Sequence, residues 1–371
     1  MKKIAAVVMA AAMVLCFAAC TGSNEGSSKE ILIGATGPLT GGAASYGNSV
    51  KNGAELAIAE INAAGTKNGL TFKFQILDDE ADAEKAASGY DTLISSGMKA
   101  SIGSVTSGSA EAFAKRAKED QVFFMTPSAS AASVIATGDN IFRVCFGDPQ
   151  QGELAAAELV KTYKKIGCIY DTSDTYSAGI YEAFEAEMKK LNTAYEVRTF
   201  DADNKTDFTA QVEGLKDCEV IFLPIYYTEA GLIARTCTSK GLENIVLFGC
   251  DGLDGVAAEI DATVKNAISY ITPFDVNAST SVTANFVKKY TEKYGAAPDQ
   301  FAADGYDAVY AVVKAIEAAD VKDAKISAAD LCKDIVKVIT SDSFQMEGAT
   351  GVMSWDTTGS CNKVPVIVSV Q

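Results

Sequence analysis

Residues 31–62 read ILIGATGPLTGGAASYGNSVKNGAELAIAEIN. The run from Ile31 to Thr36 is short and rich in β-branched residues, which predicts a strand. From Tyr46 to Asn62 the apolar residues recur at three- and four-residue spacing, which predicts an amphipathic helix. A strand that passes through a glycine-containing turn into a helix is the repeating unit of α/β folds, so this stretch indicates that class.

The same unit recurs along the chain in two series of similar length. The first series contains further predicted strands at 72–78, 100–105 and 122–126 and helices at 84–95 and 109–119. After Asp148-Pro149 the pattern restarts, with strands at 166–170, 195–200, 220–224 and 245–250 and helices at 177–191, 207–215 and 229–239. Strands that alternate with helices form parallel sheets covered on both faces, so two series predict two lobes.

The last part of the chain breaks this alternation. It contains a predicted strand at 268–274, then helices at 282–294, 302–319 and 328–339, and finally strands at 351–355 and 364–370. Helices without strands between them have to pack on an existing sheet, so lobe membership should switch here. Ligands of open parallel sheets bind beyond the carboxyl ends of the strands, so two facing lobes predict a binding cleft.

Composition excludes several classes of function. The 371 residues include 32 basic and 48 acidic side chains, a net charge of −16, which disfavours a nucleic-acid-binding protein. The chain has no histidine, which excludes Ser–His–Asp and Cys–His catalytic groups and any histidine metal site. The loop at 37–42 lacks the lysine of a phosphate-binding loop. We therefore expect no cofactor, no metal site and no enzymatic activity.

The first residues have the pattern of an export signal. Lys2 and Lys3 precede a short apolar run, and the small residues Ala18 and Ala19 stand immediately before Cys20, which resembles a bacterial lipoprotein box. This predicts a signal peptide over 1–19, lipid attachment at Cys20 and a flexible Gly/Ser-rich tether over 20–29, so that only a lipid anchors the chain to the membrane. An ordinary signal peptide with an incidental cysteine is the alternative.

The remaining cysteines do not form a recognisable disulfide framework. There are seven beyond Cys20, at positions 145, 168, 218, 237, 250, 332 and 361. None of them belongs to a C-x-x-C pair, and most lie within apolar runs, so we expect buried free thiols in preference to disulfides.

Hydroxyl-rich turns follow two strands of the first series. The segments are Ser104-Val105-Thr106-Ser107-Gly108-Ser109 and Thr126-Pro127-Ser128-Ala129-Ser130. Hydroxyl groups and free N–H groups at a helix start can bind an anion, although a plain serine N-cap would have the same sequence. Neighbouring parallel strands would bring the two turns side by side, and their donors would suit a small carboxylate.

The second series carries aromatic and acidic residues at the corresponding strand ends. They lie at Tyr170–Tyr176, Ile225–Tyr227 and Cys250–Gly252, with Asp251 as the carboxylate in the last turn. If the lobes close on one ligand, one side binds an anion and the other a cation, which fits a zwitterion such as an amino acid. Taken alone, each tyrosine is better explained as a wall or core residue than as a ligand contact.

A family resemblance runs through the chain from Gly37 to its end. It is carried by Gly37-Pro38-Leu39-Thr40-Gly41, Asn52-Gly53-Ala54-Glu55-Leu56-Ala57, Asp78-Asp79-Glu80, Thr106-Ser107-Gly108, Thr126-Pro127-Ser128-Ala129, Phe142-Arg143, Asp148-Pro149-Gln150-Gln151-Gly152, Tyr226-Tyr227-Thr228-Glu229-Ala230-Gly231 and Gly305-Tyr306-Asp307-Ala308-Val309-Tyr310. In these motifs the chain resembles the branched-chain amino-acid binding proteins of ABC transporters.

The resemblance implies a type I periplasmic-binding-protein fold, with each lobe a mostly parallel sheet flanked by helices and three hinge crossings between the lobes. Lobe 1 would comprise 30–148 plus 275–350, and lobe 2 would comprise 149–274 plus 351–371. By the same resemblance, Ser107 and Ser130 would bind the ligand carboxylate. The Ser128 carbonyl and the Asp251 carboxylate would bind the ammonium group. The walls would be Tyr46, Tyr176, Phe301 and either Tyr226 or Tyr227, with Tyr226 preferred.

The implied function is capture of an amino acid outside the cytoplasm and its delivery to ABC permease subunits. Leucine, isoleucine and valine are the leading ligands, and the protein would be a monomeric lipoprotein on a Gram-positive surface or in a periplasm. The chain has only four arginines, none in the proposed turns, which disfavours a dicarboxylate ligand. An aromatic amino acid, a small amide or another zwitterion is an alternative ligand, and a sensory ligand-binding module is an alternative function.

Overall fold

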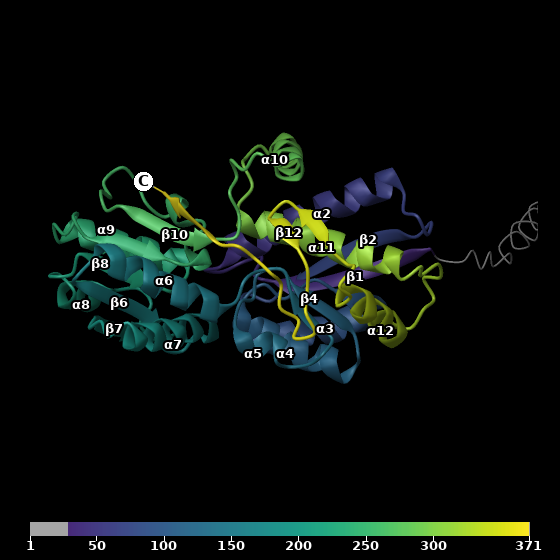
Figure 1. The fold of residues 1–371 in the computed structure, drawn as a ribbon, viewed down its shortest axis with the longest axis horizontal. Helices are drawn as coiled ribbons and strands as arrows, with labels where there is room; N and C mark the ends of the chain where they lie inside the picture. The colour runs from purple at the N-terminus through teal and green to yellow at the C-terminus, as the bar shows by residue number, and fades with distance from the viewer. Residues whose placement is uncertain (1–28, 371) are drawn as a thin grey trace, which may run out of the picture.

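The computed structural model describes residues 29–370, which form two α/β lobes arranged side by side along the long axis of the molecule (Figure 1). Lobe 1 contains a parallel sheet in the order β2-β1-β3-β4-β5. Its strands are β1 (Glu30–Gly37), β2 (Thr71–Asp78), β3 (Met98–Ser101), β4 (Phe123–Thr126) and β5 (Ile141–Arg143). The intervening helices are α2 (Ala44–Ala64), α3 (Ala83–Ser95), α4 (Ser107–Glu119) and α5 (Ala132–Ile135).

Lobe 2 contains a sheet in the order β13-β10-β9-β8-β6-β7, parallel except for β13, which runs antiparallel to β10. Its strands are β6 (Ile166–Asp171), β7 (Glu196–Phe200), β8 (Val220–Leu223), β9 (Val246–Gly249), β10 (Ile268–Thr272) and β13 (Val366–Ser369). Its helices are α6 (Asp148–Thr162), α7 (Thr175–Lys190), α8 (Thr209–Gly214) and α9 (Tyr227–Ser239). The predicted α/β class with a mostly parallel sheet in each of two lobes is confirmed.

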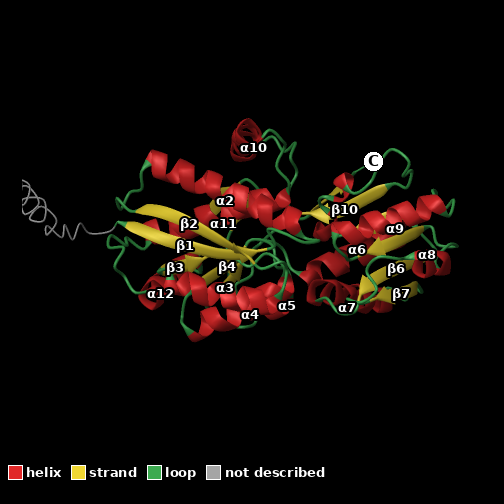
Figure 2. Cartoon of the chain, turned by 180° about the vertical axis from the view of Figure 1, so that it is seen from behind, coloured by secondary structure: helices red, strands yellow, loops and turns green. Residues whose placement is uncertain are grey.

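Both sheets are covered on both faces, as Figure 2 shows. In lobe 1 the large core cluster joins α2 to the later helices, and a separate cluster packs α3 and α4 against the opposite face. In lobe 2 one cluster packs α6 and α7, and the other packs α8 and α9. The near-continuous apolar strands of the sequence are therefore explained by burial from two sides.

The helices of the last section pack on lobe 1, as expected. They are α10 (Ser281–Tyr294), α11 (Gln300–Ala318) and α12 (Ala328–Ile339). Helix α11 packs very closely on α2. A Cβ atom added at Gly53 would lie only 1.9 Å from the carbonyl oxygen of Ala302. The two glycines Gly53 and Gly305 thus allow the close approach that fixes the start of α11.

Three segments cross between the lobes: the one after β5, the one after β10 and the one before β13. The lobe boundaries remain a proposal. The short strand β12 (Gly351–Met353) pairs with β11 (Met346–Gly348), and Trp355 and Cys361 lie in the lobe 1 core cluster. These contacts favour a third crossing after Cys361 over one at residue 350.

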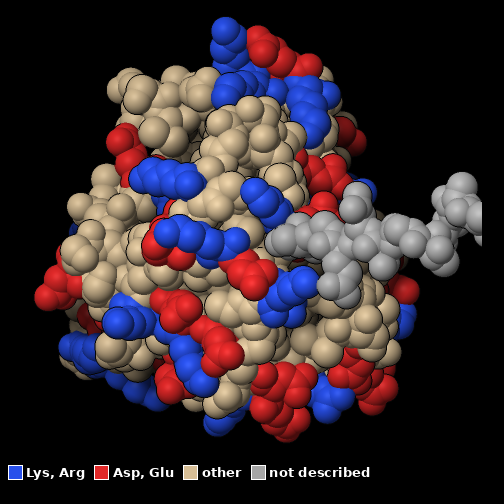
Figure 3. All heavy atoms as spheres, turned by 90° about the vertical axis from the view of Figure 1, so that its right-hand side faces the viewer, with Lys and Arg blue, Asp and Glu red and all other residues tan. Residues whose placement is uncertain are grey.

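The seven cysteines beyond Cys20 are all buried, each as a free thiol in the described part of the chain. Between residues 29 and 370, no helix is long and apolar enough to cross a membrane. The predicted signal peptide, the lipidation site Cys20 and residues 20–28 of the tether lie outside the described residues. On the end of the molecule seen in Figure 3, acidic and basic side chains alternate without forming a patch of one sign.

Candidate functional site

A narrow cavity lies between the two lobes and is lined from both. Its residues are Tyr46, Val105, Thr106, Ser107, Ser128, Tyr176, Tyr226, Asp251, Gly252 and Phe301. Seven of the eight predicted ligand-binding residues are in this set, and the exception is Ser130. The volume open to the centre of a water molecule is about 20 Å³, enough for one water. An amino acid therefore requires the side chains or the lobes to move apart.

The hydroxyl-rich turns lie side by side because β3 and β4 are hydrogen-bonded neighbours. Thr126 joins them, since its Oγ1 donates to the Ser104 carbonyl at 2.7 Å and accepts from the Ala129 N–H at 2.9 Å. Ser128 Oγ donates to the Val105 carbonyl at 2.8 Å. The Ser107 Oγ accepts a long hydrogen bond from the Ala131 N–H at 3.3 Å. The two turns thus form one polar wall of the cavity.

Thr106 is a cavity residue that the sequence did not single out. It is the N-cap of α4, but its side chain makes no capping hydrogen bond, and its Oγ1 is buried without a hydrogen-bond partner among the described residues. An unpaired buried hydroxyl is costly, so this group is available to a bound molecule. In the sequence, Ser104-Val105-Thr106 before the helix indicated only a helix N-cap. Nothing in it marked Thr106 as a ligand contact in addition to Ser107.

Ser130 does not line the cavity. Its carbonyl oxygen accepts from Arg143 Nη1 at 2.6 Å and from the Asp148 N–H at 3.0 Å, so its backbone joins the turn after β4 to the first lobe crossing. These bonds engage only its carbonyl, so the predicted contact of Ser130 with the ligand carboxylate stays a prediction.

Asp251 lies on the opposite wall, two residues after the end of β9, as the first residue of the short helix η1 (Asp251–Leu253). The side chain is buried, and its Oδ1 accepts from the Tyr176 hydroxyl at 2.7 Å. Burial raises the pKa of Asp251 to about 6, and the hydrogen bond from Tyr176 opposes that rise. A buried carboxylate of this kind is stabilised by a nearby cation.

Aromatic rings enclose the space between these walls. Tyr46 stacks on Phe301 with ring centroids 4.1 Å apart, and Tyr176 stacks on Tyr226 at 5.1 Å. Tyr226 lines the cavity, whereas Tyr227 packs edge-on against Tyr46 at 5.0 Å. Of the two tyrosines left open by the sequence, Tyr226 is therefore the one that faces the cavity.

Tyr46 also joins the lobes directly. It lies in α2 of lobe 1. Its hydroxyl donates to the Gly252 carbonyl and accepts from the Tyr227 N–H, and both of these partners belong to lobe 2. Thr228 Oγ1 adds a third bond between the lobes by donating to the Gly42 carbonyl at 2.9 Å. The lobes are thus in hydrogen-bonded contact across the cleft.

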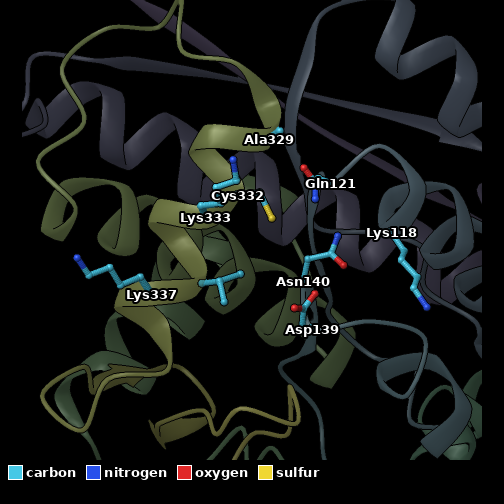
Figure 4. Close-up of a pocket in the computed structure, with 9 residues that line it drawn as sticks. Lys118, Gln121, Asp139, Asn140, Ala329, Cys332, Lys333 and Lys337 are labelled. Carbon is cyan, nitrogen blue, oxygen red and sulfur yellow. The ribbon is translucent and has the colours of Figure 1, made fainter.

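A larger cavity between α12 and the turns around β4 and β5 is a weaker candidate (Figure 4). Its volume is about 470 Å³, and Lys118, Asp139, Asn140, Cys332 and Lys337 are among its lining residues. The buried Asn140 amide already donates to the carbonyls of Ala117 and Val122. The amines of Lys118 and Lys337 point away from the centre in Figure 4. No buried polar group of this cavity is left to recognise a ligand.

Two α/β lobes with three crossings, and a cleft with hydroxyls on one wall, a carboxylate on the other and aromatic rings between, define a two-lobed solute-binding protein. The chain belongs to the periplasmic binding protein family, whose pattern it matches over residues 30–352. It is therefore a binding protein and not an enzyme.

Its relatives include two proteins named for branched-chain amino acids. The Leu/Ile/Val-binding protein BraC3 of Rhizobium johnstonii is 30% identical over 336 residues, 89% of this chain and 88% of that protein. The Leu/Ile/Val-binding protein homolog 3 of Brucella melitensis is 33% identical over 238 residues, 63% of this chain and 64% of that protein.

Solved structures give the same fold. The leucine-binding protein LivK of Thermotoga maritima is 27% identical with a TM-score of 0.80, covering 91% of this chain and 94% of its own. LivJ of Streptococcus pneumoniae, in complex with isoleucine, is 28% identical with a TM-score of 0.81, covering 91% and 95%. A Rhodopseudomonas palustris solute-binding protein in complex with benzoate is only 22% identical and shows the fold alone.

Proposed function

We propose that this protein captures an amino acid in the cleft between its lobes and delivers it to the permease subunits of an ABC transporter. Leucine, isoleucine and valine are the leading ligands. This choice is supported by relatives at about 30% identity that are named Leu/Ile/Val-binding proteins and by the isoleucine complex of LivJ.

The observation that carries the proposal is the opposed polarity of the cavity walls. In this proposal the Ser107 hydroxyl and the N–H groups at the start of α4 bind the ligand carboxylate. The Ser128 carbonyl and the Asp251 carboxylate accept hydrogen bonds from the α-ammonium group. The rings of Tyr46, Tyr176, Tyr226 and Phe301 contact the ligand side chain, which favours an apolar one. Ser130 holds the turn after β4 through its carbonyl, and its contact with the ligand carboxylate remains part of the proposal.

Asp251 also argues for an amino acid over a simple carboxylate. A ligand without an ammonium group would leave the buried Asp251 carboxylate without a cation and would add a second negative charge nearby. No lysine or arginine lines the cavity within the described residues. An acidic side chain on the ligand would therefore lack a partner, which disfavours glutamate and aspartate.

The proposal extends to the location of the protein. The signal peptide over 1–19 would direct export and then be removed. Lipid attachment at Cys20 would anchor the mature protein on the outer side of the membrane, with residues 20–29 as the tether. In that arrangement the binding lobes act as a monomer, on the surface of a Gram-positive cell or in a periplasm. Metabolic labelling with a lipid precursor, compared between the wild-type chain and Cys20→Ala, tests the anchor.

A ligand screen tests the proposed binding function. A ligand that binds only the folded protein raises its melting temperature, so all proteinogenic amino acids and benzoate should be compared at equal concentration. We expect leucine, isoleucine or valine to give the largest rise and benzoate to give none. Stabilisation by benzoate, or by no amino acid, would overturn the proposal.

A further inference from the structure

Two glutamine side chains hold the backbone of Asp251. The Asp251 N–H donates to Gln151 Oε1 at 3.1 Å, and the Asp251 carbonyl oxygen accepts from Gln300 Nε2 at 2.6 Å. Both glutamines are buried, with exposures of 0% and 1%. The position of the Asp251 carboxylate thus depends on side chains that lie 100 and 49 residues away in the sequence.

Gln300 makes two more hydrogen bonds, and these also reach lobe 2. Its Oε1 accepts from Thr272 Oγ1 at 3.0 Å, at the end of β10. Its backbone N–H donates to Asp254 Oδ2 at 3.0 Å, just beyond η1. All three bonds outside its own helix therefore go to the segment that carries Asp251 or to the neighbouring strand.

Gln300 itself is fixed to lobe 1. It is the first residue of α11, whose close packing on α2 leaves no room for a Cβ atom at Gly53 or Gly305. The preceding residue, Asp299, caps the helix by accepting from the Ala302 N–H at 2.8 Å, and its other oxygen accepts from Ser49 Oγ of α2. The following residue, Phe301, stacks on Tyr46. The bonds of Gln300 to Asp251 can therefore form only when the lobes are together.

We propose that Gln300 is a positioning residue that sets the Asp251 carboxylate when the lobes close, so that recognition of the ligand ammonium group is completed by closure. This inference rests on the proposed binding of an amino acid. When the lobes separate, the Asp251 carbonyl loses its partner in lobe 1, and the turn after β9 keeps only bonds within lobe 2, among them those to Gln151, Tyr176 and Tyr270. The hydroxyl wall of lobe 1 needs no such contact, because its hydrogen bonds are internal to that lobe.

A double-mutant cycle separates this role from a general contribution to lobe contact. Gln300→Met keeps the length of the side chain and the backbone bond to Asp254 but removes the bonds to Asp251 and Thr272. We expect it to weaken leucine binding by about tenfold, the loss of a buried hydrogen bond. In the Asp251→Asn background the same change should weaken binding less than twofold, because the carboxylate that it positions is gone.

Thr228→Val is the matched control, since it removes a bond between the lobes that does not involve Asp251. Its effect on leucine affinity should be the same in both backgrounds. Titration calorimetry, with competition experiments for the weak variants, gives the leucine affinities of the wild type, the single variants and the double variants. Circular dichroism confirms that each variant is folded.

The outcomes distinguish the inference from the function on which it rests. Coupling between positions 300 and 251, without coupling between 228 and 251, supports the positioning role. Equal losses for Gln300→Met in both backgrounds would overturn it and leave amino-acid binding intact. Failure of the wild-type protein to bind any amino acid would overturn the proposed function itself.

Discussion

Asp251 is the residue on which the chemistry of the cleft depends most directly. Its carboxylate is buried, and one of its oxygens is already engaged by Tyr176. We predict that Asp251→Ala weakens amino-acid binding by about 2–5 kcal/mol, because the ligand ammonium group would be left buried and unpaired. Titration calorimetry measures the change, with the exposed Asp342→Ala as control. Unchanged affinity in Asp251→Ala would remove this residue from the site.

The raised pKa of Asp251 makes a pH-dependent prediction of definite sign. Burial raises that pKa to about 6, whereas an unperturbed aspartate has a pKa of about 3.9. Binding of an ammonium group requires the ionised carboxylate, so the affinity for leucine should fall by about tenfold per pH unit below pH 6. Calorimetry between pH 5 and 7 checks this, and Asp251→Asn should flatten the profile.

The same group should have the opposite effect on the stability of the ligand-free fold. A raised carboxyl pKa means that the folded state binds the proton more tightly than the unfolded state. Its stabilising contribution is therefore complete below about pH 3.9 and is lost as the pH rises through about 6. An affinity for leucine that rises on acidification from pH 7 to 5 would contradict the ionic role of Asp251.

Sequence reasoning was most successful for residues that follow a strand directly. Ser107, Ser128, Tyr226 and Asp251 each come just after a predicted strand, and the parallel sheets bring these strand ends to one cleft. Ser130 was predicted from the family resemblance; it does not border the closed cavity, and its contact with a ligand stays a prediction. Gln151 and Gln300 could not have been found, because side-chain bonds to a distant backbone leave no local pattern.

At the scale of helices and strands, the sequence missed several short elements and one long one, helix α6 (Asp148–Thr162). β5 and β11 contain three residues each, too few to show an alternation of apolar and polar residues. The other long helices were recovered with small shifts at their ends: the helix predicted at 302–319 is α11, Gln300–Ala318. That shift has consequences for the site, since Gln300 belongs to the first turn of α11, where its side chain reaches lobe 2.

The contact between α2 and α11 supports the next prediction. Gly53→Ala would place a methyl group against the Ala302 carbonyl, where the available distance is 1.9 Å, so one helix would have to move. We expect a loss of about 1–3 kcal/mol in the free energy of unfolding, measured in urea. Gly108→Ala is the matched helical control, because nothing lies within 4 Å of its added carbon. Equal stability of the two variants would show that the helices are not held at this distance.

At the scale of the whole molecule, the two lobes meet through direct bonds as well as through any ligand. Tyr46 donates to Gly252 and accepts from the Tyr227 N–H, Thr228 donates to Gly42, and Gln300 bonds to Asp251. Three connecting segments permit a hinge motion between the lobes. The volume of the cavity that is open to the centre of a water molecule is only about 20 Å³. This closed arrangement therefore cannot admit an amino acid from solution without opening.

Closure should therefore be visible in solution and should depend on Tyr46. Small-angle scattering should show a smaller radius of gyration when leucine is added, because the ligand adds contacts between the walls that exist only in the closed form. Tyr46→Phe keeps the stacking on Phe301 but removes two hydrogen bonds between the lobes, each worth about 1 kcal/mol. It should need more leucine to reach the same compact dimensions. Tyr195→Phe, which removes a hydroxyl that is hydrogen-bonded to Tyr181 within lobe 2, should behave as the wild type. If leucine binds but leaves the radius of gyration of the wild-type protein unchanged, lobe closure is not the mechanism of capture.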